Sequence, residues 1–171
     1  MNKRIEKVLN DQIVKESSSS QLYLSMASWA EGQGYNGTAS FLYKHSDEER
    51  FHMLKLIKFV NERGGVADIP SIDKPPISFE SMEKIFTSLL EHEIIVTESI
   101  NNVVDLCLQE KDYTTHNFIQ WYVSEQLEEE ALARSILDKL KLIGKDKGGL
   151  YLFDRDMENS SISSDSETQG A

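Results

Sequence analysis

The residues that interrupt helices fall into a few groups, and this grouping constrains the fold more than any other feature. Most glycines lie at 32–37, 64–65 and 144–149, and all three prolines lie at 70–76. Glycine, proline and asparagine are the strongest local breaks in regular structure. The long segments between these groups therefore predict helices. We place them at 3–33, 37–64, 78–109 and 112–143, with a short fifth helix at 150–157.

The lengths of the connections predict how these helices are arranged. The first and third connections are short, so each joins an antiparallel pair, and Asp112 can cap the fourth helix. The connection at 65–77 could reach about 43 Å when extended. A helix of 28 residues is about 42 Å long, so this connection can cross the whole bundle. The sequence therefore predicts an all-α four-helix bundle with one long crossover between parallel second and third helices.

Composition suggests one domain and excludes several kinds of partner and site. We assign a domain to residues 1–157 and a disordered, polar, serine-rich tail to 158–171. The net charge of -11 disfavours binding to nucleic acid or to anionic membranes. A single cysteine, Cys107, excludes a cysteine-based zinc or iron–sulfur site. The chain lacks an apolar run of about 20 residues and a signal-peptide pattern, so we expect a cytoplasmic protein.

Each of the four long segments carries an apolar stripe that is interrupted by glutamate near the middle. Glu16, Glu49, Glu93 and Glu129 all lie within about one turn of the midpoint of their own segment. The midpoint stays at the same level whichever way a helix points, so the four carboxylates should meet inside the bundle. His52 follows Glu49 by one turn. On the fourth segment the predicted inward stripe contains Phe118, Tyr122, Glu125, Glu129, Leu132, Ile136, Leu140 and Ile143.

These glutamates predict a metal site. A single glutamate in a helix usually belongs to a solvated face, but that explanation does not account for four stripes interrupted at one level. Buried carboxylates repel one another and are costly unless they are neutralised, which bound cations do well. Oxygen ligands with one imidazole suit iron(II), manganese or zinc. The i, i+3 spacing of Glu49 and His52 puts both on one face, as in carboxylate-bridged di-iron bundles.

Over residues 1–157 the sequence resembles the bacterial non-haem ferritins. The most specific shared segment runs from Trp121 to Glu130 and reads WYVSEQLEEE. The segment DEERFHM at 47–53 also carries the resemblance. Further matching positions are Glu16, Tyr23, His92, Glu93 and the ending Gly148-Gly149-Leu150-Tyr151.

The resemblance implies a role for each matching residue. Glu16, Glu49 and His52 match the ligands of the first iron of a ferroxidase centre, and Glu49 would bridge to a second iron held by Glu93 and Glu129. A third iron site would use Glu48, Glu125 and Glu128 together with Glu129. Tyr23 would lie beside the centre, and Gln126 would support its ligands. The resemblance also implies oxidation of Fe(II) by O2 or H2O2 and storage of ferric mineral in a hollow cage of 24 identical subunits.

Departures from related families limit these expectations. Haem-binding relatives carry methionine immediately after the bridging glutamate, whereas this chain has Arg50, so we expect no haem. The fourth helix reads Gln126-Leu127-Glu128-Glu129 and lacks a second Glu-x-x-His motif. Three alternatives stay open: a DNA-protecting mini-ferritin, a non-catalytic helical scaffold, and a cage that binds manganese or zinc natively. The preferred oxidant, the channels and the reductant for iron release are not predicted.

Overall fold

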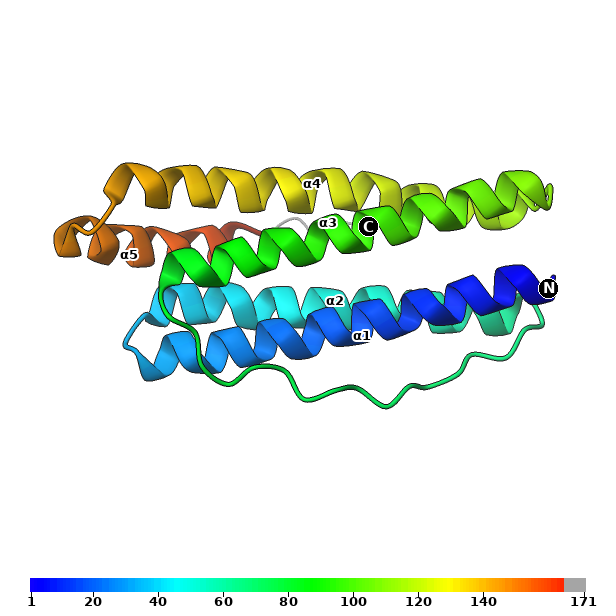
Figure 1. Ribbon diagram of the computed structural model, residues 1–171, viewed down its shortest axis with the longest axis horizontal. Helices are drawn as coiled ribbons and strands as arrows, with labels where there is room; N and C mark the ends of the chain where they lie inside the picture. The colour runs from blue at the N-terminus through cyan, green and yellow to red at the C-terminus, as the bar shows by residue number, and fades with distance from the viewer. Residues whose placement is uncertain (165–171) are drawn as a thin grey trace.

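The protein is a bundle of long helices. The computed structural model describes residues 1–164, with residues 159–164 described by their backbone alone, and this part contains helices and no strands. The helices α1 and α2 form one antiparallel pair and α3 and α4 form another (Figure 1). The predicted all-α bundle with a fifth helix is therefore confirmed. The elements are α1 (Lys3–Gly32), α2 (Asn36–Glu62), α3 (Met82–Gln109), α4 (Tyr113–Ile143) and α5 (Lys147–Ser164).

The crossover at 63–81 runs alongside α1 from one end of the bundle to the other (Figure 1). Asn10 of α1 fixes its first part, donating to the carbonyl of Val66 at 3.0 Å and accepting from the amide of Asp68 at 2.7 Å. The crossover ends later than the sequence predicted. Ser81 has an extended backbone and its hydroxyl accepts from the amide of Lys84 at 3.2 Å, so α3 begins at Met82 rather than at position 78.

The start of α4 follows the prediction closely. The carboxylate of Asp112 caps this helix, accepting from the amide of Thr115 at 3.1 Å. The same carboxylate accepts two hydrogen bonds of 2.9 Å from the guanidinium of Arg63. Asp112 therefore joins the end of α2 to the start of α4.

The fifth helix is longer than predicted and folds back along the bundle. Its first turn is capped by Asp146, which accepts from the amide of Gly149 at 2.6 Å, so it begins before position 150. It packs chiefly against α2, where Phe153 and Met157 are buried. Residues 158–164 are therefore helical where a disordered tail was expected. The rest of that predicted tail, 165–171, lies outside the described residues.

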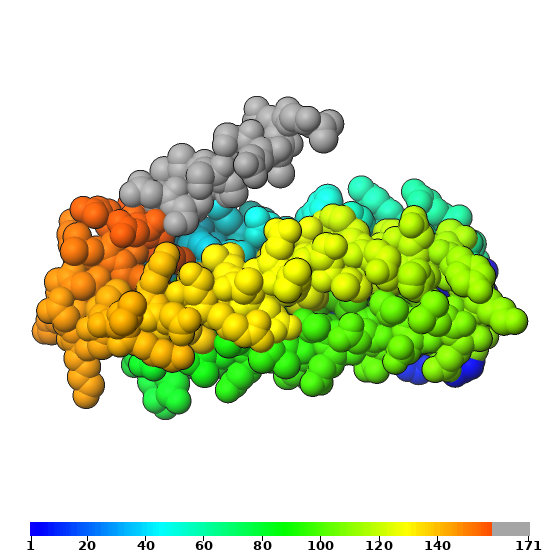
Figure 2. Space-filling model, turned by 90° about the horizontal axis from the view of Figure 1, so that it is seen from above, coloured from blue at the N-terminus to red at the C-terminus, as the bar shows by residue number. Residues whose placement is uncertain are grey.

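The interior has two apolar clusters with a polar layer between them. One cluster, around Phe86, includes the buried side of α5 and the neighbouring ends of α1 to α4. The other, around Ile100, fills the opposite end. Figure 2 shows the elongated molecule with α4 along this face and α5 gathered at one end. Within the described part, no helix combines the length and apolar character needed to cross a membrane.

Candidate metal centre

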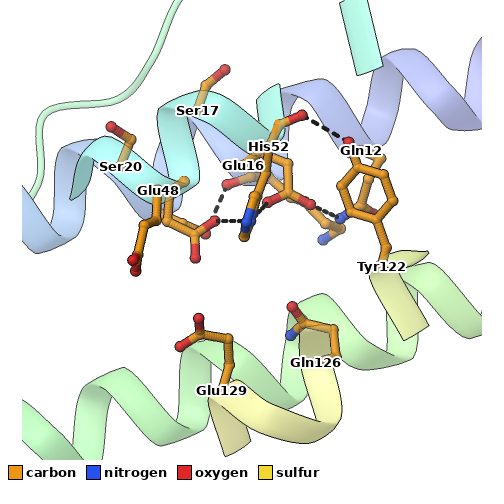
Figure 3. Close-up of polar contacts among 12 residues, drawn as sticks. Gln12, Glu16, Ser17, Ser20, Glu48, His52, Tyr122, Gln126 and Glu129 are labelled. Carbon is orange, nitrogen blue, oxygen red and sulfur yellow. Dashed lines mark hydrogen bonds and ion pairs between the residues drawn. The ribbon is translucent and has the colours of Figure 1, made fainter. Parts of the chain in front are cut away.

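The polar layer is built by side chains from all four long helices. Glu16 comes from α1, Glu49 and His52 from α2, and Glu93 from α3, and each of these residues is at most 4% exposed. Glu129 comes from α4, and its side chain is 13% exposed. Figure 3 shows Glu129 and Gln126 projecting from α4 toward Glu16, Glu48 and His52. The structure thus brings the predicted carboxylates to one level of the bundle.

Glu16, Glu49 and His52 form a compact group of possible ligands. Their ligand atoms all lie within 4.8 Å of one another. Nδ1 of His52 is 3.5 Å from Oε2 of Glu49 and 3.7 Å from Oε2 of Glu16. Oε1 of Glu16 accepts from Gln12 at 2.7 Å, whereas its Oε2 is buried without a hydrogen-bond partner. A buried orphan oxygen is costly, and a metal ion bound at this position would satisfy it.

The carboxylate of Glu93 is held from two sides. The phenol of Tyr23 donates a hydrogen bond to its Oε1. The side-chain amide of Gln126 donates to its Oε2 at 2.9 Å and contacts the hydroxyl of Thr97 at 3.3 Å. Partners of this kind fix the orientation of a ligand and tune its affinity. Tyr23 and Gln126 thus both contact a predicted ligand.

Three carboxyl groups of this centre have raised pKa values, so each holds its proton more tightly than an ordinary glutamate does. Burial, followed by the charges of Glu16 and Glu93, raises the pKa of Glu49 well above its ordinary value. Burial also raises the pKa of Glu93, although the hydrogen bonds from Tyr23 and Gln126 act in the opposite direction. Burial and the charges of Glu93 and Glu48 raise the pKa of Glu129 to about 8. A cation at this centre would displace these protons.

The pKa of the histidine of this centre is also raised, but here the charged form is the one that is favoured. Burial acts to lower the pKa of His52, but the contact with the Glu16 carboxylate and its charge outweigh burial, so the pKa is raised. The hydroxyl of Tyr122 donates to the backbone carbonyl of His52 at 2.8 Å and so fixes α2 against α4 at this level. The sequence pattern placed Tyr122 on an inward stripe without indicating this contact.

The inward face of α4 includes Tyr122, Ile136 and Leu140 as predicted, but it departs from the predicted stripe by one position in two places. Gln126 is 4% exposed and points into the centre, whereas Glu125 is half-buried. Leu132, also expected inside, is 39% exposed, and Ala133 is buried instead. Steps of three and four residues describe two adjacent faces equally well, so the sequence alone did not select between them.

The acidic residues expected at a third iron site lie in different surroundings. Glu48 and Glu129 lie beside His45, and these three residues form a second group of possible ligands. The charges that act on Glu125 are those of His52, Glu128 and Lys55. Glu128 is exposed. The site made of Glu48, Glu125, Glu128 and Glu129 therefore stays a prediction, and His45 is a neighbour that sequence reasoning had assigned to no site.

Fold and centre together define a class of protein: a four-helix bundle with one long crossover and an internal cluster of carboxylates and histidine. Residues 6–143 match the family model of the ferritin-like domain. The probable bacterial non-heme ferritin-like protein of Haemophilus influenzae is 45% identical over 161 residues, which is 94% of this chain and 98% of that protein. The bacterial non-heme ferritin of Campylobacter jejuni is 45% identical over 163 residues, with 95% and 98% covered.

A solved structure agrees with these relatives. The open pore ferritin from the hyperthermophilic archaeon Archaeoglobus fulgidus superposes with a TM-score of 0.91 at 40% identity, and the match covers 92% of this chain and 96% of that one. The chain belongs to the ferritin family.

Proposed function

We propose that this protein stores iron and that each chain oxidises Fe(II) to Fe(III) at its own buried centre. The observation that carries the proposal is the group of Glu16, Glu49 and His52, which is buried in one chain and includes a carboxylate oxygen without a hydrogen-bond partner. The charges of Glu93 and Glu129 also act on Glu49, so ligands from all four long helices adjoin the group. This arrangement favours an intra-subunit centre over the inter-subunit site of a mini-ferritin.

Iron is the substrate in this proposal. Glu16 and His52 would bind one Fe(II), Glu93 and Glu129 would bind a second, and Glu49 would bridge the two. Each ion gives up one electron, so a pair supplies the two electrons that reduce O2 to H2O2 or H2O2 to water. Carboxylate oxygens are hard ligands that stabilise Fe(III) over Fe(II), which makes oxidation easier once iron is bound. Carboxyl groups that are protonated in the metal-free protein release protons as iron binds.

Storage requires that copies of the chain enclose a space. We propose a hollow cage of 24 subunits without haem, in keeping with the family. The crossover exposes three large apolar residues, Val66, Ile69 and Ile77, each at least 68% exposed. They are spread along the crossover, and exposed apolar side chains of this size are candidates for burial against another chain. They support assembly but do not define its symmetry.

Single substitutions at the centre test the ferroxidase proposal. Glu49→Ala and His52→Ala should each slow the first phase of aerobic Fe(II) oxidation by at least about tenfold, because each removes a ligand. Both variants should keep their helical content, and Glu49→Ala should be at least as stable as the parent in the metal-free form, because one buried carboxyl group is gone. The measurement is ferric absorbance after stopped-flow mixing.

A matched control is His116→Ala, which removes a histidine of α4 whose Nε2 lies 3.5 Å from the side-chain amide of Gln120. This variant should oxidise iron at the parent rate. If both centre variants also keep the parent rate, the ferroxidase centre does not lie here and the proposal is wrong.

A further inference from the structure

A pocket of about 170 Å³ lies between α3 and α4, which run side by side on the face shown in Figure 2. Because a water molecule occupies about 30 Å³ in the liquid, this α3–α4 pocket has room for one small molecule together with water. The described residues that line it come from both helices and include apolar, polar and charged side chains. They are Thr97, Ile100, Asn101, Val123, Gln126, Leu127, Glu130 and Arg134.

The wall of the pocket nearest the buried centre is formed by Gln126, which also contacts a predicted iron ligand. Its side-chain amide donates to Oε2 of Glu93 at 2.9 Å and to the backbone carbonyl of Glu93 at 3.2 Å. Gln126 is 4% exposed, and Figure 3 shows its side chain projecting from α4 toward the centre. The pocket therefore lies one side chain away from a predicted iron ligand.

The charges in the pocket are paired with each other. The carboxylate of Glu130 accepts hydrogen bonds from the hydroxyl of Thr97 at 2.7 Å and from the guanidinium of Arg134. The bond from Thr97, together with the bond and charge of Arg134, lowers the pKa of Glu130, so this carboxylate is ionised and balances the guanidinium. Among the described residues that line the pocket, these two are the charged ones. The pocket therefore offers a cation little net attraction.

The other walls suit a small uncharged molecule better than a metal ion. Ile100, Val123 and Leu127 offer apolar contacts, and the side chain of Asn101 adds a polar group at the wall. O2 is apolar and H2O2 forms hydrogen bonds, and each has two heavy atoms, so both match this mixture of surfaces. Iron would need several oxygen or nitrogen ligands, whereas the carboxylate of this pocket is already held by its partners.

We propose that the α3–α4 pocket is the entrance through which a small uncharged oxidant, O2 or H2O2, reaches the buried centre. The inference rests on the proposed ferroxidase function and adds to it an entrance for the second substrate. Two Fe(II) ions supply two electrons, and two protons complete the reduction of O2 to H2O2 or of H2O2 to two water molecules. Access requires the side chain of Gln126 to move, because it lies between the pocket and Glu93.

Filling the pocket tests this role. Asn101→Phe places a ring at the pocket wall, and Asn102→Phe is the matched control because Asn102 is the next residue, is exposed and lies outside the pocket. In stopped-flow mixing at several O2 concentrations, Asn101→Phe should lower the second-order rate constant of the first oxidation phase by at least about fivefold. Asn102→Phe should keep the parent value. The same series with H2O2 in the absence of O2 tests the second oxidant, and a loss with one oxidant alone assigns the entrance to that oxidant.

Metal binding without oxidation separates access from ligand damage. Anaerobic titration with Co(II) should give the parent stoichiometry and affinity in both variants, because neither asparagine is a predicted ligand. Loss of Co(II) binding in Asn101→Phe would contradict the inference, since the substitution would then act on the ligands. Far-ultraviolet circular dichroism establishes that both variants are folded.

Xenon gives a measurement that does not depend on activity, because this gas enters small apolar cavities. Crystals of the parent and of Asn102→Phe under xenon pressure should show a xenon peak beside Ile100 and Val123, and crystals of Asn101→Phe should lack it. A parent pocket that stays free of xenon would overturn the inference.

The kinetic outcomes also distinguish this inference from the function on which it rests. Equal rate constants in Asn101→Phe and Asn102→Phe with both oxidants would overturn the entrance and leave the ferroxidase proposal intact. Oxidation at the buffer rate in the parent would refute the ferroxidase function, and the role of the pocket as an oxidant entrance would be refuted with it.

Discussion

At the scale of single residues, the glutamates of the centre are costly to ionise while no metal ion is bound. Glu49, Glu93 and Glu129 all have raised pKa values because burial removes their carboxylates from water. One carboxylate oxygen of Glu16 is buried without a hydrogen-bond partner. Such groups weaken the folded state when they ionise, so the metal-free protein should report on them directly.

Stability of the metal-free protein should fall as the pH rises from about 5 to about 8.5. The pKa of Glu129 is 4.5 ordinarily and about 8 in the folded chain. Between pH 4.5 and pH 8 the folded state holds a proton on Glu129 that the unfolded state has lost. The stabilisation of the folded state by this proton is therefore fully present below pH 4.5 and disappears as the pH passes 8. The free energy of unfolding changes by about 1.4 kcal/mol for each unit by which the folded and unfolded pKa values differ. Thermal unfolding at several pH values measures it.

Two controls identify the cause of this pH dependence. Glu129→Gln removes one titrating group and should flatten the curve. Zinc should reverse the trend, because ligands must lose protons to bind it and binding therefore strengthens as the pH rises. A melting temperature that stays level or rises across this range in metal-free parent protein would contradict the assignment of buried, protonated glutamates.

At the scale of helices, α5 supplies a cap that α2 lacks. The residue before α2, Tyr35, offers no side-chain hydrogen bond. Asp154 of α5 accepts instead from the amide of Thr38 at 2.8 Å and from that of Gly37 at 3.1 Å. A Cβ at Gly37 would lie 1.8 Å from the carbonyl oxygen of Asp154, so only glycine allows this approach.

Asp154→Ala should destabilise the protein by about 1–2 kcal/mol, because it leaves the first amides of α2 without partners. Gly37→Ala should cost more, since backbone would have to move. Chemical denaturation measures both, and hydrogen exchange should show faster exchange across α5. Asp138→Ala is the control, because that exposed residue of α4 forms a surface ion pair with Lys141 at 3.4 Å, and its effect should stay within about 0.5 kcal/mol. Equal stability of Asp154→Ala and the control would refute the cap.

The sequence predicted the helices well where local signals determine them and less well elsewhere. Breakers and periodicity located α1 to α4 because a helix depends on its own residues, and Asp112 showed its capping role in advance. The place of α5 depends on a contact with Gly37 from a distant part of the chain, which no local pattern contains. The heights of the glutamates along their helices predicted that the carboxylates meet, but they did not indicate that His45 lies beside Glu48 and Glu129. A buried histidine on an apolar stripe gives the same sequence pattern whatever its neighbours are.

At the scale of the whole molecule, the chain places a polar layer between two apolar clusters. The clusters around Phe86 and Ile100 hold the two ends of the bundle together, so the helices tolerate repulsion at the level of the carboxylates. Stability supplied at the ends thus permits a centre that is costly when empty. In a cage, every subunit would carry such a centre beside the stored iron.

Aerobic addition of Fe(II) to metal-free protein, followed by sizing of the product, tests the central claim most directly. The expected result is oxidation well above the rate in buffer, followed by iron that co-elutes with a large, hollow protein particle. Oxidation at the buffer rate, or iron that separates from the protein as free precipitate, would contradict the proposal that this ferritin-family chain is a ferroxidase that stores iron.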